Sequence, residues 1–181
     1  MTIACRTSFV LIAVIFMSVT LSSTGHKITD TQIKHLCSKT HNFNGCYKLL
    51  KSDYHSVHVD LQGLAGLSID LALKVGNKIN SYLNSLAEET HDSQLRNVYG
   101  LCSNNYNNAI HDLEVAKENL NSGSYSKMPV QIKDAFEETE NCKDLLVTST
   151  SIDPADIKKK NRHFQFLISI VMVISINLNK N

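Results

Sequence analysis

Tryptophan is absent from this 181-residue chain, which also holds only 2 prolines and 7 glycines. So few turn-forming residues argue against a barrel or sandwich of many short strands, and they favour long helices. There is no Asn-X-Ser/Thr sequon, so N-glycosylation is not expected. The chain also lacks a Gly-X-Ser-X-Gly motif, a P-loop and a dinucleotide-binding fingerprint. We therefore expect a helical protein that is not an enzyme and needs no cofactor.

The first 25 residues are organised like a secretory signal peptide. Arg6 supplies a positive charge, residues 9–21 form an apolar run, and small residues at 23–25 suit cleavage. The run is shorter than the roughly 20 residues that a bilayer-spanning helix needs. A short signal anchor is the alternative. We predict a signal peptide at 1–25 and a secreted mature domain at 26–181.

The mature chain has little net charge but an uneven charge distribution. Cleavage removes Arg6 and no acidic residue, which leaves 17 basic against 17 acidic side chains. This balance is not that of a nucleic-acid-binding protein. Residues 88–156 nevertheless hold 13 acidic and 5 basic residues, and a basic run follows at 158–162. The acidic segment is either a set of solvated helix faces or a surface that steers a basic partner.

Four long segments carry apolar residues at three- and four-residue steps, the spacing of one helical face. They cover about 60–86, 92–120, 125–146 and the chain from 153 onward. In the first segment the stripe consists of Leu64, Leu67, Leu71, Val75, Ile79, Tyr82 and Leu86.

Short links join these segments, at 87–91, 121–124 and 147–152. Asp92 or Ser93 can cap the second helix, and Asp153 followed by Pro154 is typical of the start of the fourth. Because short links make long amphipathic helices antiparallel neighbours, the sequence predicts an all-α, up-down four-helix bundle.

The apolar run at 164–176 in the fourth segment is too short for a comfortable membrane span. We predict a heavily buried helix and no stable membrane insertion. A lipid-anchor signal is the alternative, although the polar residues at the tip of the chain argue against it.

Four cysteines remain after Cys5 is removed with the signal peptide, and four cysteines allow three pairings. Cys102 and Cys142 each lie 20 residues from Ser122 in a predicted turn, so an antiparallel pair of helices places them at the same height. A bridge there stabilises by about 4 kcal/mol in the chain-entropy model. Cys37–Cys46 follows by elimination and closes a hairpin within 26–56, ahead of the bundle at 57–181.

Three kinds of candidate site residue remain. Glu88 and His91 form a single Glu-X-X-His, whereas a di-metal bundle needs two such motifs and two more carboxylates, so no metal site is predicted. Tyrosine is enriched at interfaces, which makes Tyr99, Tyr106 and Tyr125 candidate anchors. The helical spacing of Tyr106 is more typical of a core residue, and the loop edge favours Tyr125. Within the first predicted helix, Gly63 and Gly66 are expected to let a neighbouring helix approach closely.

Several short stretches resemble the plant invertase and pectin methylesterase inhibitor family. They are Cys37-Ser-Lys-Thr, Cys46-Tyr-Lys-Leu-Leu, Cys102-Ser-Asn-Asn-Tyr106, Glu140-Asn-Cys142 and Lys159-Lys-Asn161. The stretch at 60–68 is similar to the subgroup around the plane-tree pollen allergen, which is described as an invertase inhibitor.

The resemblance implies a helical hairpin before a four-helix bundle, bridges between the first two and the last two cysteines, and no catalysis. It also implies a secreted protein of the apoplast, or alternatively the vacuole, that covers the active-site cleft of a pectin methylesterase or an acid invertase. A monomer or weak dimer is expected. Invertase-directed members carry Pro-Lys-Phe before the last helix, and residues 147–153 lack it. The target is therefore open, and a non-inhibitory secreted binding protein or a pollen or seed allergen is the alternative function.

The predicted partner-binding region is either a helix face or the loop at 147–153, and Tyr125 at the edge of the turn at 121–124 is a further candidate contact. The candidate contact residues are Tyr125, Ser149, Ser151, Asp153 and Pro154.

Overall fold

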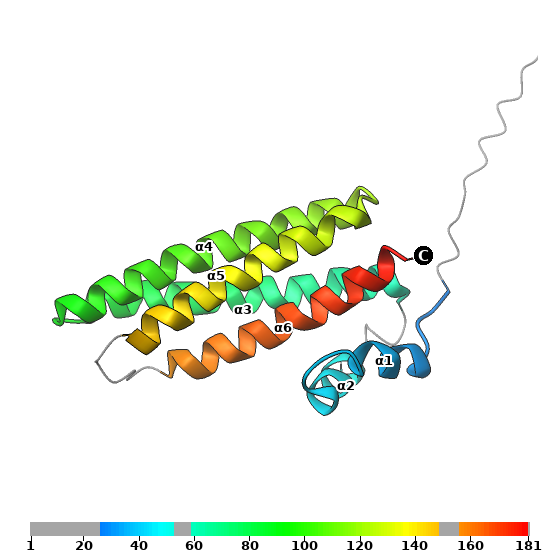
Figure 1. Ribbon diagram of the computed structural model, residues 1–181, viewed down its shortest axis with the longest axis horizontal. Helices are drawn as coiled ribbons and strands as arrows, with labels where there is room; N and C mark the ends of the chain where they lie inside the picture. The colour runs from blue at the N-terminus through cyan, green and yellow to red at the C-terminus, as the bar shows by residue number, and fades with distance from the viewer. Residues whose placement is uncertain (1–25, 53–58, 149–155, 181) are drawn as a thin grey trace, which may run out of the picture.

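The computed structural model describes residues 26–52, 59–148 and 156–180, and throughout these ranges the regular structure is helical. The helices are α1 (Asp30–Cys37), α2 (Phe43–Ser52), α3 (Leu61–Glu89), α4 (Ser93–Asn121), the 3-10 turn η2 (Tyr125–Lys127), α5 (Met128–Thr148) and α6 (Ile157–Leu178). Helices α3 to α6 run alternately up and down as a four-helix bundle, and α1 and α2 form a hairpin beside α6 (Figure 1). The predicted fold class is confirmed.

Side-chain caps fix the starts of α3 and α4 close to the predicted positions. The Asp60 carboxylate accepts a hydrogen bond from the Gly63 amide at 2.8 Å. The Asp92 carboxylate accepts from the amides of Gln94 and Leu95, at 2.8 and 3.1 Å. These bonds satisfy amides that have no partner within the first turn of a helix.

The predicted start of the last helix needs a correction. Asp153 and Pro154, its expected cap and first residue, lie outside the described residues, and the described helix begins at Ile157. Its N-cap is Asp156, with a positive φ of 60° and no side-chain capping bond. Aspartate is one of the few residues other than glycine that tolerate this left-handed conformation.

The buried face of α3 is rotated from the predicted stripe. Tyr82, expected in the core, is 37% exposed, whereas its neighbour Leu83 is fully buried. The Lys160 ammonium lies 5.3 Å from the centre of the Tyr82 ring. The buried residues of α3 are Leu64, Ala65, Ser68, Ile69, Ala72, Gly76, Ile79 and Leu83.

A glycine does allow close helix packing in α3, but it is not one of the two predicted. A Cβ on Gly76 would lie 2.8 Å from Phe164 Cζ, so the missing side chain admits the α6 aromatic ring. A Cβ on Gly66 would be in ordinary contact, 3.6 Å from Leu120 Cδ2. A Cβ on Gly63 would meet Val59, which lies just ahead of the same helix. The predicted role of Gly63 and Gly66 is therefore wrong.

Helix α6 is long and apolar enough to cross a membrane by length and composition, yet 56% of its most apolar window is buried in the protein. The buried side chains line its face toward the bundle: Ile157, Asn161, Phe164, Leu167, Ile168, Ile170, Val171, Ile174, Ser175 and Leu178. Packing in the bundle therefore accounts for most of the apolar composition of this helix.

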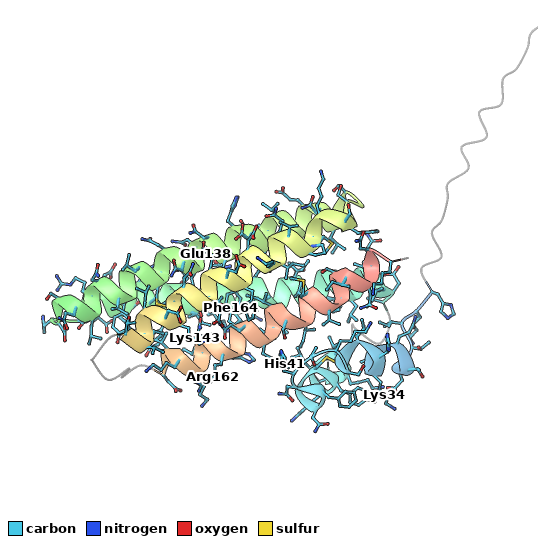
Figure 2. All side chains as sticks on the ribbon, viewed as in Figure 1. Lys34, His41, Glu138, Lys143, Arg162 and Phe164 are labelled. Atoms are coloured by element: carbon cyan, nitrogen blue, oxygen red, sulfur yellow. A yellow bond between two sulfur atoms is a disulfide. The ribbon has the colours of Figure 1, made fainter. Side chains whose placement is uncertain are left out.

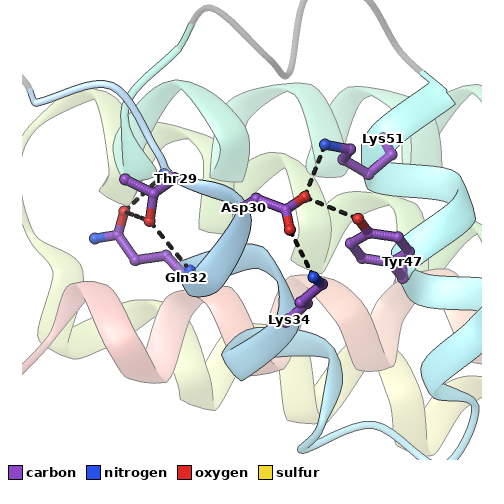
Figure 3. A network of polar contacts seen from close by, with 6 residues as sticks. All are labelled: Thr29, Asp30, Gln32, Lys34, Tyr47 and Lys51. Carbon is purple, nitrogen blue, oxygen red and sulfur yellow. Dashed lines mark hydrogen bonds and ion pairs between the residues drawn. The ribbon is translucent and has the colours of Figure 1, made fainter.

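The α1–α2 hairpin is held by a disulfide and a polar network. Cys37 and Cys46 are bonded, with their Cα atoms 5.5 Å apart. Asp30 accepts hydrogen bonds from the Tyr47 hydroxyl at 2.8 Å and from Lys51 at 2.7 Å, and it pairs with Lys34 at 2.9 Å (Figure 3). Hydrogen bonds from Lys34, Lys51 and Tyr47, in that order of effect, lower the pKa of Asp30 well below its usual range.

A capping box starts the hairpin. The Thr29 hydroxyl accepts from the Gln32 amide at 3.2 Å, and the Gln32 side chain accepts from the Thr29 amide at 2.8 Å (Figure 3). Two long-range bonds then fasten the hairpin to the bundle. The Ile28 amide donates to the Val59 carbonyl at 2.9 Å, and the Lys39 ammonium donates to the Asn177 side chain at 3.1 Å.

Candidate partner-binding surface

Helices α4 and α5 form the most strongly braced pair in the bundle. Cys102 and Cys142 are bonded, fully buried, and separated by 4.7 Å between their Cα atoms. The two cysteines thus lie at the same height, as the symmetric spacing around Ser122 predicted. With Cys37–Cys46, this gives the predicted pairing of all four cysteines.

A buried polar chain ties α4, α5 and α6 together beneath the surface. The Tyr106 hydroxyl donates to Asn161 Oδ1 at 2.8 Å, and Asn161 Nδ2 donates to the Thr139 carbonyl at 3.0 Å. The Tyr106 ring stacks on Phe164, with 5.3 Å between centroids, and burial raises the pKa of the Tyr106 hydroxyl. Tyr106 is therefore a core residue.

Tyr99 lies in the core as well, with 1% of its surface exposed. A buried side chain cannot anchor a partner, so the suggestion that Tyr99 contacts another protein is wrong. The helical spacing placed Tyr99 one turn before Cys102 and Ser103, and this is the side of α4 that turns inward.

Tyr125 is accessible enough to contact a partner, so it stays a candidate contact residue. It lies half-buried in η2, at the start of α5. The other four candidates, at positions 149, 151, 153 and 154, lie outside the described residues. Thr148, the last described residue before them, ends α5. A helix of this length separates Tyr125 from Thr148 by about 30 Å. Tyr125 and Thr148 therefore lie at opposite ends of the bundle.

Acidic side chains gather on the face shared by α4 and α5. Burial and the nearby charges of Asp134 and Glu138 raise the pKa of Asp112 above its usual value, although His111 opposes them. The Asn108 amide reaches across from α4 to Glu138 at 3.3 Å, and Figure 2 shows Glu138 on this face. Crowded carboxylates repel one another. We call Asp112, Asp134 and Glu138 the acidic face.

A basic hollow lies on the other side of α5, against α6. Its volume is about 280 Å³. Three cationic side chains surround it, and Figure 2 labels two of them, Lys143 and Arg162. Lys143 is paired with Glu140. The lining residues are Lys143, Leu146, Val147, Lys158, Asn161, Arg162 and Gln165. The basic run seen in the sequence thus supplies one wall of a surface hollow.

In the described ranges, no group of three or more His, Cys, Asp or Glu side chains could hold a metal ion. Glu88 and His91 are both exposed, at the end of α3 and in the link to α4. The described surface thus offers charged helix faces and a half-buried tyrosine, which are features of protein recognition.

Comparisons with known proteins identify the family. The model of the family described as plant invertase/pectin methylesterase inhibitor matches residues 31–174. The pectinesterase inhibitor of Actinidia deliciosa is 32% identical over 165 residues, which cover 91% of this chain and 89% of that protein. A Platanus orientalis protein named as an invertase inhibitor is 26% identical over 134 residues, 74% of this chain and 78% of that protein.

A solved structure gives the same result. The crystal structure of mutant form A of a pectin methylesterase inhibitor from Arabidopsis matches with a TM-score of 0.73 and 27% identity. The match covers 80% of this chain and 95% of the other. The resemblance noted in the cysteine-containing motifs is confirmed, and this chain belongs to the plant invertase/pectin methylesterase inhibitor family.

Proposed function

We propose that this protein is secreted and inhibits a pectin methylesterase by binding over its active-site cleft, without catalysing a reaction. The observation that carries the proposal is the relationship to the Actinidia pectinesterase inhibitor, which extends over 91% of the chain at 32% identity. The Arabidopsis structures that share the bundle are also named as pectin methylesterase inhibitors. The site of action would be the apoplast, reached through the signal peptide at 1–25.

The acidic face of α4 and α5 is the proposed contact surface. Burial is the main cause of the raised pKa of Asp112, and the nearby carboxylates of Asp134 and Glu138 add repulsion to it. A basic surface on the partner would remove that repulsion on binding and would speed association by electrostatic steering. A surface that steers a basic partner is one of the two interpretations of the acidic excess at 88–156, and solvated helix faces are the other.

Rigidity supports inhibition by occlusion. The Cys102–Cys142 bridge and the Tyr106–Asn161 hydrogen bond fix α4 relative to its neighbours. A surface that is already ordered loses less conformational entropy on docking, so more of the contact energy becomes affinity.

An acid invertase is the second candidate target, because relatives from Platanus and Arabidopsis are named as inhibitors of invertase and fructosidase. The segment at 147–153 lacks the Pro-Lys-Phe expected of invertase-directed members, which favours pectin methylesterase.

A paired titration tests the proposal. The oxidised mature protein, residues 26–181, is added to a pectin methylesterase and to an acid invertase at mildly acidic pH. We expect pectin methylesterase activity to fall to a minimum near a one-to-one ratio. Loss of invertase activity alone would transfer the assignment to the second target. No effect on several isoforms of either enzyme would favour the alternative of a non-inhibitory secreted binding protein.

Charge reversal tests the contact surface. Glu138→Lys is expected to weaken inhibition at least about tenfold, because it places a cation opposite a basic partner. Glu89→Lys makes the same change at the end of α3, away from the acidic face, and should leave inhibition unchanged. Equal effects of the two variants would contradict the proposed surface.

A further inference from the structure

A second concave surface, separate from the acidic face, lies where the hairpin meets the bundle. It has a volume of about 380 Å³, toward the lower end of the range of about 300–1,000 Å³ for small-molecule sites. The turn of the hairpin, α5 and α6 all contribute to it. We call it the hairpin groove, and its lining residues are Lys39, Thr40, His41, Lys133, Phe136, Ile168, Ser169, Met172, Val173 and Ile176.

The floor of the hairpin groove is apolar, and the packing of the bundle covers it only in part. Phe136, Met172 and Val173 are only partly buried, and Ile176 is 39% exposed. The opposite face of α6 already supplies the core. Helix α6 therefore carries apolar side chains beyond those that the bundle needs, and such exposed apolar surface is typical of a binding site.

The rim of the groove is cationic. Its two lysines are Lys39 on the hairpin side and Lys133 on the α5 side. His41 is another lining residue on the hairpin side (Figure 2 labels His41). Lys133 is paired with Glu137. Lys39 donates to the neutral side chain of Asn177, and no ion pair within the described ranges involves it. An ammonium group has three donors, so Lys39 can bind a carboxylate while it keeps its bond to Asn177.

From the apolar floor, the cationic rim and the volume together, we infer that the hairpin groove binds a small amphipathic carboxylate, a free fatty acid of medium chain length. The hydrocarbon chain would lie on Phe136, Met172 and Ile176. The carboxylate would lie at the hairpin turn, within reach of Lys39. This site is independent of the acidic face and does not depend on which enzyme the protein inhibits.

The charge and shape of the groove favour such a ligand over a second copy of the chain. A protein interface is broad and loses about 800 Å² of surface on each partner, whereas this site is a small hollow. Two copies related by symmetry would also bring identical cationic rims together.

Calorimetric titration of the oxidised, secreted protein with laurate, below its micelle concentration, tests the inference. We expect saturable binding near one laurate per chain. Ile176→Lys should weaken it at least about tenfold, because it places an ammonium group on the apolar floor. Leu101→Lys is the matched control, since Leu101 is 40% exposed on α4 and lies outside the groove. It should bind laurate like the unchanged protein.

Lys39→Glu provides a second test that does not depend on the core, because Lys39 is exposed. It should weaken laurate binding at least about tenfold and leave binding of the uncharged alcohol dodecanol within about twofold. The inference is overturned if laurate shows no saturable binding, or if Ile176→Lys and Leu101→Lys weaken it equally. It is also overturned if light scattering finds a dimer that Ile176→Lys dissociates, or if the protein binds anionic vesicles but not free laurate.

Discussion

The bundle and the hairpin each contain a pair of helices joined by a disulfide, but the balance of forces that hold them differs. In the bundle, Tyr106 stacks on Phe164 in the core, where both side chains are fully buried. In the hairpin, Phe43 stacks on Tyr47 with centroids 6.0 Å apart, and Phe43 is 40% exposed. Both regions bury apolar side chains, and Ile33, Leu36 and Leu50 are those of the hairpin. The hairpin is much smaller, and it is also held by its disulfide and by exposed charges around Asp30.

This difference predicts that the stability of the hairpin depends more on pH and salt than the stability of the bundle does. Burial is nearly insensitive to pH and salt, whereas exposed ion pairs are screened by salt and lost in acid. The following predictions test this contrast, from the largest effect to the smallest.

Removing a stacked phenylalanine should give the largest difference in stability between the bundle and the hairpin. Phe164→Ala leaves a cavity beside Gly76 and Tyr106 and should lower the free energy of unfolding by roughly 3–5 kcal/mol. Phe43→Ala removes the exposed ring of the hairpin and should cost less than about 1 kcal/mol. Urea unfolding followed by circular dichroism measures both. Similar losses would show that the hairpin is packed as tightly as the core.

Removing the disulfides one at a time should give unequal losses. The bridges close loops with sequence separations of 40 and 9 residues. Loop-closure entropy therefore predicts a loss of about 4 kcal/mol for Cys102→Ser with Cys142→Ser, and of about 3 kcal/mol for Cys37→Ser with Cys46→Ser. The first pair should lower the midpoint of the whole bundle. The second should mainly expose the hairpin to proteolysis, and retention of its protease resistance would contradict this contrast.

The buried hydrogen-bond chain should contribute a smaller amount. Tyr106→Phe keeps the stacked ring but leaves Asn161 Oδ1 without its donor, so we expect a loss of about 1–3 kcal/mol. Tyr82→Phe changes an exposed hydroxyl on α3 and is the control, with an expected change below about 0.5 kcal/mol. Thermal unfolding of both variants at neutral pH would measure the difference.

Acid should weaken the hairpin before it affects the bundle. The folded-state pKa of Asp30 lies below its ordinary value of 3.8, so its ion pairs contribute fully above about pH 4 and are lost as the pH falls further. Hydrogen exchange should show decreasing protection of α1 and α2 in that range. Asp30→Asn should abolish this pH dependence. Asp70→Asn, which breaks a surface pair with Lys117 on the bundle, should leave it intact.

Much of this architecture could be predicted because the relevant patterns are local. A capping residue such as Asp92 marks the start of a helix, and the equal spacing of Cys102 and Cys142 from one turn marks a shared height. The face of α3 could not be predicted in the same way. Leucines and alanines occupy several of its sides, so the periodicity does not decide between Tyr82 and Leu83.

Contacts between residues far apart in the sequence could not be predicted, because no local pattern says which helix packs against which. Gly76 is meaningful only because Phe164, 88 positions later in the chain, packs against it. Asn161 could be recognised as a family residue, but only the structure joins it to Tyr106 and Thr139. The hairpin groove combines residues from three elements, none of which has a distinctive motif alone.

The position of the Cys102–Cys142 bridge also bears on resistance to proteases. The turn at 121–124 is exposed over most of its length, and Gly123 has a φ of 71°. A protease that cut this turn would leave two fragments, one ending in α4 and the other beginning near η2. The bridge lies 20 residues from the turn on each side, deep in the bundle, so the fragments would stay covalently joined and in register. A nicked inhibitor could therefore keep its acidic face intact, and cleavage would be visible only after the protein is reduced.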